Sequence, residues 1–140
     1  MSAEDTGVTD AAGLVREMGL RFTAGDFDGA FALLHPEFRI QQPASLPHGG
    51  LHHGRDGMVG MGSVFARYWD RVIGEPHILG CGGEQAVQIT TQTWTAKATG
   101  RSATVDVAEL FTVADGLIRE IRVFQQDTHA LLATLDGVIP

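Results

Sequence analysis

The first third of the chain repeats its apolar residues with the period of a helix. From Asp10 onward, apolar side chains recur at steps of three and four. Asp10 can cap this helix and Gly25 lies where it should end. Asp26 can cap a second helix, which the pair His35-Pro36 should end because the residue before a proline avoids the helical conformation. The apolar positions are Ala11, Leu14, Val15, Met18 and Phe22 in the first helix and Phe27, Ala30, Phe31 and Leu34 in the second.

A short strand and a third helix are expected next. Residues 38–42 alternate between apolar and polar side chains, which predicts a strand that Pro43 closes. The stretch of residues 41–57, which begins at the end of this strand, is too rich in glycine and proline for regular structure, so we expect a flexible rim between strand and helix. Asp56 can cap the third helix. Its apolar positions are Met58, Met61, Phe65, Tyr68, Trp69 and Val72.

The second half of the chain changes to the pattern of strands. Residues 86–97 are rich in Val, Ile, Thr and Trp, and Asp115-Gly116 is typical of a hairpin turn. Helices against one face of a mostly antiparallel sheet predict an α+β fold. Residues 1–9 are read as a flexible tail and 10–140 as a single domain. The expected strands are 76–80, 86–97, 103–113 and 117–126, followed by a helix that Asp127 caps, that runs to Leu135 and that Gly137 ends.

Composition narrows the function classes. The formal charge of −7 argues against binding to nucleic acid phosphates, which requires a basic face. No apolar run approaches the roughly 20 residues of a membrane span, and the acidic N-terminal residues do not resemble a signal peptide. Cys81 is the only cysteine, so no disulfide can form within the chain. We therefore expect a cytoplasmic protein without nucleic acid or membrane partners.

The order of these elements resembles the nuclear transport factor 2-like superfamily, which includes ketosteroid isomerases and SnoaL-like polyketide cyclases. The residues that carry the resemblance are 24–29 between the first two helices, Pro43, residues 53–56, residues 109–113 and residues 115–118. The resemblance implies a cone-shaped curved sheet around three N-terminal helices, with a central pocket and a short C-terminal helix. It also implies a homodimer through the outer face of the sheet. The superfamily fixes the fold and leaves the chemistry open.

Two of the catalytic positions of the ketosteroid isomerases are changed here. Those enzymes use an Asp base, with a Tyr and a protonated acid as hydrogen-bond donors to the oxyanion. The resemblance puts Gln42 at the position of the base and Met18 at that of the Tyr. An amide cannot take the proton and a thioether donates nothing, so steroid isomerisation by that mechanism is not expected.

The third position keeps a carboxyl group, that of Glu109. Its strand places Val105, Val107, Phe111 and Val113 on the same face, which is the surrounding of an acid inside a pocket. Burial there should raise its pKa and make it a general acid or base near neutral pH. The alternatives are a pair with an arginine inside the fold, or a side chain that points to solvent at a bulge.

Two glutamines complete the expected polar part of the pocket. Gln42 and Gln125 share the inward side of their strands and could form a polar triangle with Glu109; the alternative is that both strand ends reach solvent. Most of the apolar residues at this spacing would be simple core. The expected walls are Met18, Phe22, Phe31, Leu34, Ile40, Met58, Met61, Phe65, Trp69, Trp94 and Phe111, of which all but Phe31, Leu34, Ile40 and Met58 are predicted ligand contacts.

The histidines of the glycine-rich stretch are the other candidates for chemistry. His48 or His52 could act as a general base near the mouth of the pocket, whereas His53 is read as structural; the alternative is three solvated loop histidines. Neighbouring glycines make a helical zinc site improbable, so no metal is predicted. Arg55 and Asp56 are expected to fix the helix start by capping and pairing. No nucleotide-binding loop is present, and no cofactor is predicted.

Together these residues favour a small enzyme that uses acid/base chemistry. Isomerisation, cyclisation or hydrolysis of an apolar, oxygenated small molecule such as a polyketide or terpenoid is expected, with Glu109 as the group that handles the proton or stabilises an oxyanion. The second interpretation is a non-catalytic ligand-binding or dimeric accessory protein with the same fold, which the changes at Gln42 and Met18 keep open.

Overall fold

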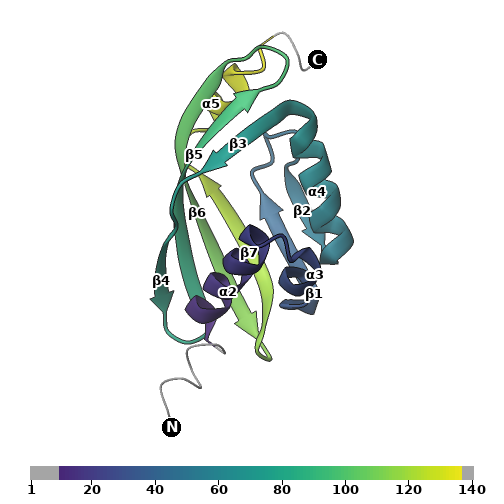
Figure 1. The fold of residues 1–140 in the computed structure, drawn as a ribbon, viewed down its shortest axis with the longest axis vertical. Helices are drawn as coiled ribbons and strands as arrows, with labels where there is room; N and C mark the ends of the chain where they lie inside the picture. Colours follow the sequence, from purple (N-terminus) through teal and green to yellow (C-terminus); the bar gives the residue numbers. More distant parts are fainter. Residues whose placement is uncertain (1–9, 137–140) are drawn as a thin grey trace.

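The structure, a computed structural model, describes residues 10–136, in which a curled seven-stranded sheet carries the helices (Figure 1). The expected tail at residues 1–9 and the glycine expected to end the last helix, Gly137, lie outside the described residues. The helices are α2 (Ala11–Thr23), α3 (Phe27–Phe31), α4 (Gly54–Tyr68) and α5 (Thr128–Ala133). The strands are β1 (Leu34–Gln42), β2 (Gly50–His53), β3 (Trp69–Ile73), β4 (His77–Cys81), β5 (Gln85–Ala96), β6 (Ser102–Ala114) and β7 (Leu117–Gln125).

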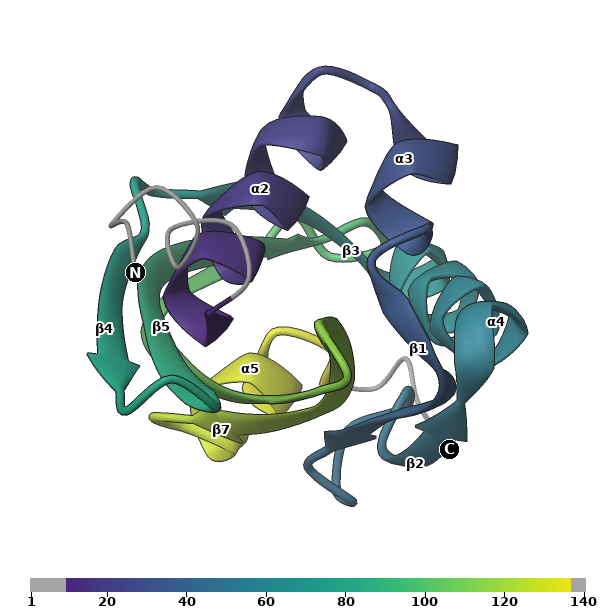
Figure 2. The same cartoon turned by 90° about the horizontal axis from the view of Figure 1, so that it is seen from below.

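The sheet is antiparallel except at one junction. Its strands follow the order β2-β1-β7-β6-β5-β3, with β4 also paired to β5. Only the pair of β1 and β7 is parallel among the described strands. Seen from below, the sheet is strongly curved, and α2 and α3 lie across its open side (Figure 2). The expected α+β cone with three N-terminal helices and a short C-terminal helix is confirmed.

Local signals of the sequence set most helix starts and the last hairpin. The side chains of Asp10, Asp26 and Asp127 accept hydrogen bonds from the backbone N–H three residues later, as predicted for helix caps. Asp115 and Gly116 both have positive φ, at 55° and 73°, which is the geometry of a two-residue hairpin turn. The predicted hairpin between β6 and β7 is therefore confirmed.

Several boundaries differ from the predictions. The last helix ends at Ala133, two residues before the predicted end at Leu135. The second helix ends at Phe31, and the residues from Leu34 onward belong to β1. The glycine-rich stretch contains the strand Gly50–His53, which pairs with β1. The third helix ends at Tyr68, so Trp69 and Val72 lie in a strand.

The start of the third helix also departs from the prediction. His53 occupies the N-cap position of α4, without a side-chain capping bond, and Asp56 lies in the first turn. Arg55 pairs with Asp28 from the neighbouring α3 rather than with Asp56. An acid in the first turn still stabilises the helix through its dipole.

The core lies between α2 and the inner face of the sheet. Leu14, Val15 and Met18 of α2 are at most 5 % exposed. The buried residues of β5, β6 and β7 alternate along each strand, as expected for one face. At the other end, the indole N–H of Trp69 donates to Thr134 Oγ1 at 2.8 Å and ties the segment after α5 to the sheet. No helix among residues 10–136 combines the length and apolar character that a membrane crossing needs.

Candidate active site

Glu109 lies on the inner face of the sheet. It belongs to β6, whose buried residues Val105, Val107 and Phe111 share its side, as the alternation predicted. The strand register puts Gln88 of β5 directly opposite. The Gln88 side-chain amide donates to Glu109 Oε1 at 3.1 Å. The carboxyl group is thus held by one neutral donor.

A small hollow of about 130 Å³ adjoins this carboxyl group. Burial raises the pKa of Glu109, while the hydrogen bond from Gln88 and the charge of Arg71 oppose that rise. The neutral form of the acid is therefore favoured over a wider pH range than for an ordinary glutamic acid. The residues that line the hollow are Val15, Met18, Gly19, Phe22, Met58, Gln88, Glu109, Phe111 and Ile121.

An apolar groove adjoins the hollow from the outside. It has a volume of about 310 Å³ and runs between α2 and the segment that includes Pro76 and Ile78. Val15, Gly19 and Gln88 line both spaces, so the two are neighbours. A ligand that reaches Glu109 can therefore extend along α2.

The predicted ligand contacts separate into two groups. Met18, Phe22 and Phe111 line the hollow at Glu109. Phe65, Trp69 and Trp94 instead pack against one another, with ring centroids 4.8 to 5.6 Å apart. Both tryptophans are 1 % exposed. The aromatic residues form a cluster of their own, and their contact with a ligand stays a prediction.

Gln42 and Gln125 lie together, but at another space. Both line a hollow of about 380 Å³ between the ends of β1 and β7. The Gln42 amide nitrogen donates to the sulfur of Met61 at 3.3 Å. The side-chain oxygens of both glutamines are buried and accept no hydrogen bond from the described residues. Among those residues no hydrogen bond joins either glutamine to Glu109, so the expected triangle does not close.

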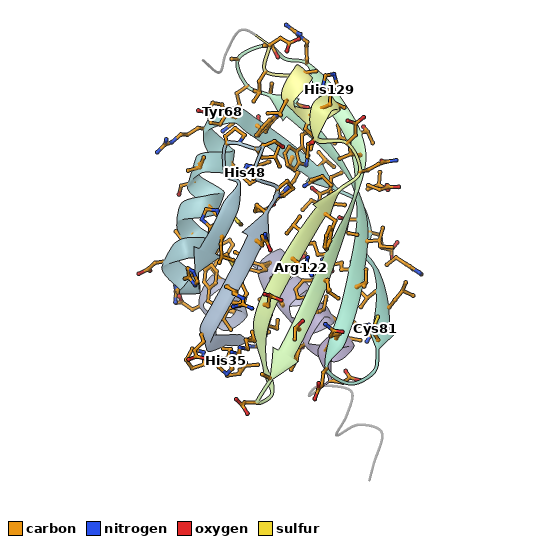
Figure 3. All side chains as sticks on the ribbon, turned by 180° about the vertical axis from the view of Figure 1, so that it is seen from behind. His35, His48, Tyr68, Cys81, Arg122 and His129 are labelled. Atoms are coloured by element: carbon orange, nitrogen blue, oxygen red, sulfur yellow. The ribbon has the colours of Figure 1, made fainter. Side chains whose placement is uncertain are left out.

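His48 is buried inside the aromatic cluster, at the end of the molecule where Tyr68 and His129 also lie (Figure 3). Its ring centroid lies 5.3 Å from that of Phe65, and its Nδ1 has no hydrogen-bond partner among residues 10–136. Burial lowers its pKa to about 4, and the positive charges of Arg71 and His52 act in the same direction. His48 is thus a neutral imidazole at neutral pH, rather than a solvated loop histidine.

The other two histidines have different surroundings. His52 is half-buried, and its Nε2 bonds to the backbone oxygen of His48 at 2.9 Å, which fixes the loop between them. His53 is exposed. Leu46 is 4 % exposed and anchors this stretch in the core, so the expected flexible rim is a packed segment. Within residues 10–136 no three His, Cys, Asp or Glu side chains are placed to hold a metal ion.

The buried imidazole predicts a loss of stability in acid. The folded-state pKa of about 4 lies below 6.5, so the unfolded chain binds this proton more readily between these values. Stability should therefore fall as the pH drops from 6.5 to 4. The full shift corresponds to roughly 3 kcal/mol, and we expect about 2 kcal/mol after solvent screening. Urea unfolding at both pH values, compared with the variant His48→Gln, measures it. An equal pH dependence in the variant would contradict the assignment.

Two polar residues of the site were not predicted. Gln88 lies on the same side of β5 as the buried residues Ala86 and Thr90, two positions from each. The predicted strand at residues 86–97 therefore already implies that Gln88 points inward. Arg71 falls within the span predicted for the third helix, where its spacing gives no sign of an inward direction. In the structure Arg71 belongs to β3, and its guanidinium carbon lies 4.7 Å from the centre of the Phe65 ring. Burial lowers the pKa of Arg71, and the charge of Glu109 opposes this.

Comparisons with known families and solved structures agree with the fold. The family model of the SnoaL-like domain matches residues 15–121. No significant match was found among curated proteins. An NTF2-like protein of unknown function from Burkholderia pseudomallei K96243 is 25 % identical, with a TM-score of 0.77 over 89 % of this chain and 95 % of that one.

More distant solved structures share the fold. An NTF2-like protein from Burkholderia thailandensis E264 has a TM-score of 0.81 at 20 % identity, covering 90 % of this chain and 97 % of that one. TerC, co-crystallised with polyporic acid, has a TM-score of 0.75 at 19 % identity, covering 89 % of this chain and 96 % of that one.

Proposed function

Because the chain belongs to the SnoaL-like family, we propose that it is an enzyme for an apolar, oxygenated small molecule such as a polyketide or terpenoid. The reaction is an isomerisation, cyclisation or hydrolysis that depends on proton transfer or on stabilisation of an oxyanion. Glu109 is the catalytic group.

One observation carries the proposal, namely a carboxyl group with a raised pKa beside an apolar hollow. A neutral carboxylic acid can donate a hydrogen bond to the oxygen of a substrate carbonyl as negative charge develops there. In its ionised form the same group can accept a proton from the neighbouring carbon. Gln88, on the facing strand, holds the carboxyl group in place for either role.

Two histidines and two glutamines are proposed to assist Glu109 by binding or positioning the ligand. His48 is a neutral imidazole whose Nδ1 has no partner among the described residues; its lowered pKa makes it a weak base, so its role is a hydrogen bond to the ligand, while His52 positions its loop. The free side-chain oxygens of Gln42 and Gln125 can accept hydrogen bonds from ligand hydroxyls. The structural likeness to TerC, which was crystallised with polyporic acid, fits a small oxygenated ligand.

A second candidate is a non-catalytic ligand-binding or accessory protein. It is favoured by the contact of Gln42 with Met61, which leaves an amide at the position where the ketosteroid isomerases carry their base. Met18 likewise lines the hollow without a donor group. In this case Glu109 would only bind the ligand.

The proposal includes a homodimer in the cytoplasm. Phe124 is 49 % exposed on the outer face of β7, where burial against a second copy would remove apolar surface from water. On the same strand, Glu120 pairs with Arg39 of the same chain at 2.6 Å. The exposed thiol of Cys81 fits a reducing compartment.

A pH profile of turnover tests the proposal. Apolar ketones and polyketide-like esters are supplied as substrates and products are followed by chromatography. An enzyme should show one ionisation above the usual pKa range of a glutamic acid, because burial raises the pKa of Glu109. The rate falls above that pKa if Glu109 donates the proton and rises if it accepts it. An ionisation that persists in Glu109→Gln would refute the assignment, and ligand binding without turnover at any pH would favour the second candidate.

A further inference from the structure

Arg71 faces the inside of the curved sheet. In the antiparallel pair of β3 and β5, Arg71 stands opposite Trp94, and Trp69 stands opposite Ala96. Residues directly opposite in such a pair lie on the same face, and Trp94 is 1 % exposed. The guanidinium carbon of Arg71 lies 4.7 Å from the centre of the Phe65 ring, so the charge is directed at the aromatic cluster.

Within the part of the chain that the structure describes, the charge of Arg71 has no ion-pair partner. Among residues 10–136, no carboxylate lies within 4.0 Å of its guanidinium, and its N–H groups form no hydrogen bond there. Glu109, the acid whose charge acts on it, is itself disfavoured from ionising by burial. Ion pairs with carboxylates hold Arg21, Arg39, Arg55, Arg101 and Arg119. Among the described residues Arg16, Arg67 and Arg122 also lack an ion pair, so what distinguishes Arg71 is its inward direction.

The surroundings of Arg71 combine a positive charge with aromatic surface. The rings of Phe65, Trp94 and His48 lie within 6 Å of one another, and His48 is neutral at neutral pH. Nearby protein atoms partly shield the guanidinium from water and lower its pKa, but Arg71 as a residue is exposed on β3, so a ligand can reach its donors. A guanidinium offers two parallel N–H groups that match a carboxylate or a similar pair of oxygens.

We propose that Arg71 binds the anionic group of the ligand, and that the ligand is an aromatic or similarly apolar acid. Its charged oxygens contact the guanidinium and its rings pack beside Phe65, which is half-buried and lies under the guanidinium. This inference rests on the proposed function, because it names the substrate class of the same site. It concerns binding, and can therefore be tested without any turnover.

Two probes of equal shape and different charge test the proposal. Isothermal titration calorimetry at pH 7 compares 2-naphthoate with its neutral analogue 2-naphthamide. The native protein should bind naphthoate at least about ten times more tightly than naphthamide. Arg71→Gln should lose this preference and keep its affinity for naphthamide. Arg71→Lys should keep part of it, because an ammonium group supplies the charge without the planar fork.

A matched control comes from the helices. Arg55 of α4 also lies over an aromatic ring, 4.7 Å from the centre of Phe31, and pairs with Asp28 of α3. Arg55→Gln should leave the preference for naphthoate unchanged. Circular dichroism checks that Arg71→Gln is folded. If it is not, Arg71→Met replaces it, because methionine keeps an aliphatic stem over Phe65.

The outcomes separate this inference from the proposed function. Equal binding of both probes by the native protein, no binding of either, or an unchanged preference in the Arg71 variants would each overturn it. Acetate should compete weakly, and competition equal to that of naphthoate would overturn the aromatic part. If Glu109→Gln abolishes turnover while the preference persists, both proposals stand. If no turnover depends on Glu109 but the Arg71 result holds, only the proposed function fails.

Discussion

Replacing Glu109 with glutamine is expected to lower turnover by at least about 100-fold, because a positioned acid or base contributes about 10² to 10⁴ to a rate. The amide has the same shape and can still accept the hydrogen bond from Gln88. It cannot release or take up a proton. Steady-state kinetics at the optimal pH of the native protein measures the loss.

The same variant should be more stable than the native protein at neutral pH. The folded-state pKa of Glu109 is raised, so the contribution of its neutral form to stability is fully present below the unfolded value of 4.5 and is lost as the pH rises through the folded value. Glutamine does not ionise and keeps its contribution at every pH. The Tm of Glu109→Gln should therefore exceed that of the native protein at pH 7, and the difference should shrink toward pH 4. Glu120→Gln, which changes an outward glutamate on β7, should alter neither quantity appreciably. Unchanged turnover in Glu109→Gln would remove the catalytic assignment.

Replacing Trp94 with alanine should reduce the free energy of unfolding by about 3–5 kcal/mol. Its side chain is 1 % exposed and packs against the rings of Phe65 and Trp69 at centroid distances of 4.8 and 5.0 Å. Its indole N–H also donates to Gln92 Oε1 at 2.9 Å, and the loss would leave that buried amide without the donor. Urea unfolding at pH 7 measures the change.

The control for this variant is Trp94→Phe. It keeps an aromatic ring in the cluster and removes the N–H, so the loss should be clearly smaller than for alanine. A loss below about 1 kcal/mol for Trp94→Ala would mean that the cluster does not hold this end of the fold together.

The sequence was most informative where local chemistry decides the structure. The caps at Asp10, Asp26 and Asp127 and the turn at Asp115-Gly116 depend on residues within three or four positions, and all four were predicted correctly. The inward direction of Glu109 also followed from the alternation of apolar residues along one strand.

Longer-range pairing explains the errors in the elements. Trp69 follows Phe65 by four residues, a helical spacing, and this extended the predicted helix into β3. Only the edge of β5, which pairs with residues 69–73, makes the extended conformation favourable there. The predicted second helix is too long for a similar reason. Leu34 pairs with Ile118 of β7, far along the chain, and this pairing makes it part of β1.

The candidate site was only partly accessible to sequence reasoning. Glu109, Met18 and Phe22 meet at one hollow, as expected. A role of Arg71 in the site could not be predicted from the helical spacing of residues 58–72. Its inward direction depends on the extended strand β3, in which it stands opposite Trp94. The burial of His48 depends on rings from α4, β3 and β5 and has no local signal.

Gly19 of α2 lines both the groove along α2 and the hollow at Glu109, at the place where the two adjoin. A Cβ atom added at Gly19 would meet no heavy atom within 4 Å, so the helix itself does not require glycine there. Alanine would even favour the helix by roughly 0.5–1 kcal/mol. Relatives with bulkier residues at this position would accept shorter molecules, and a single codon could then change the range of substrates while the reactive carboxyl group stays the same.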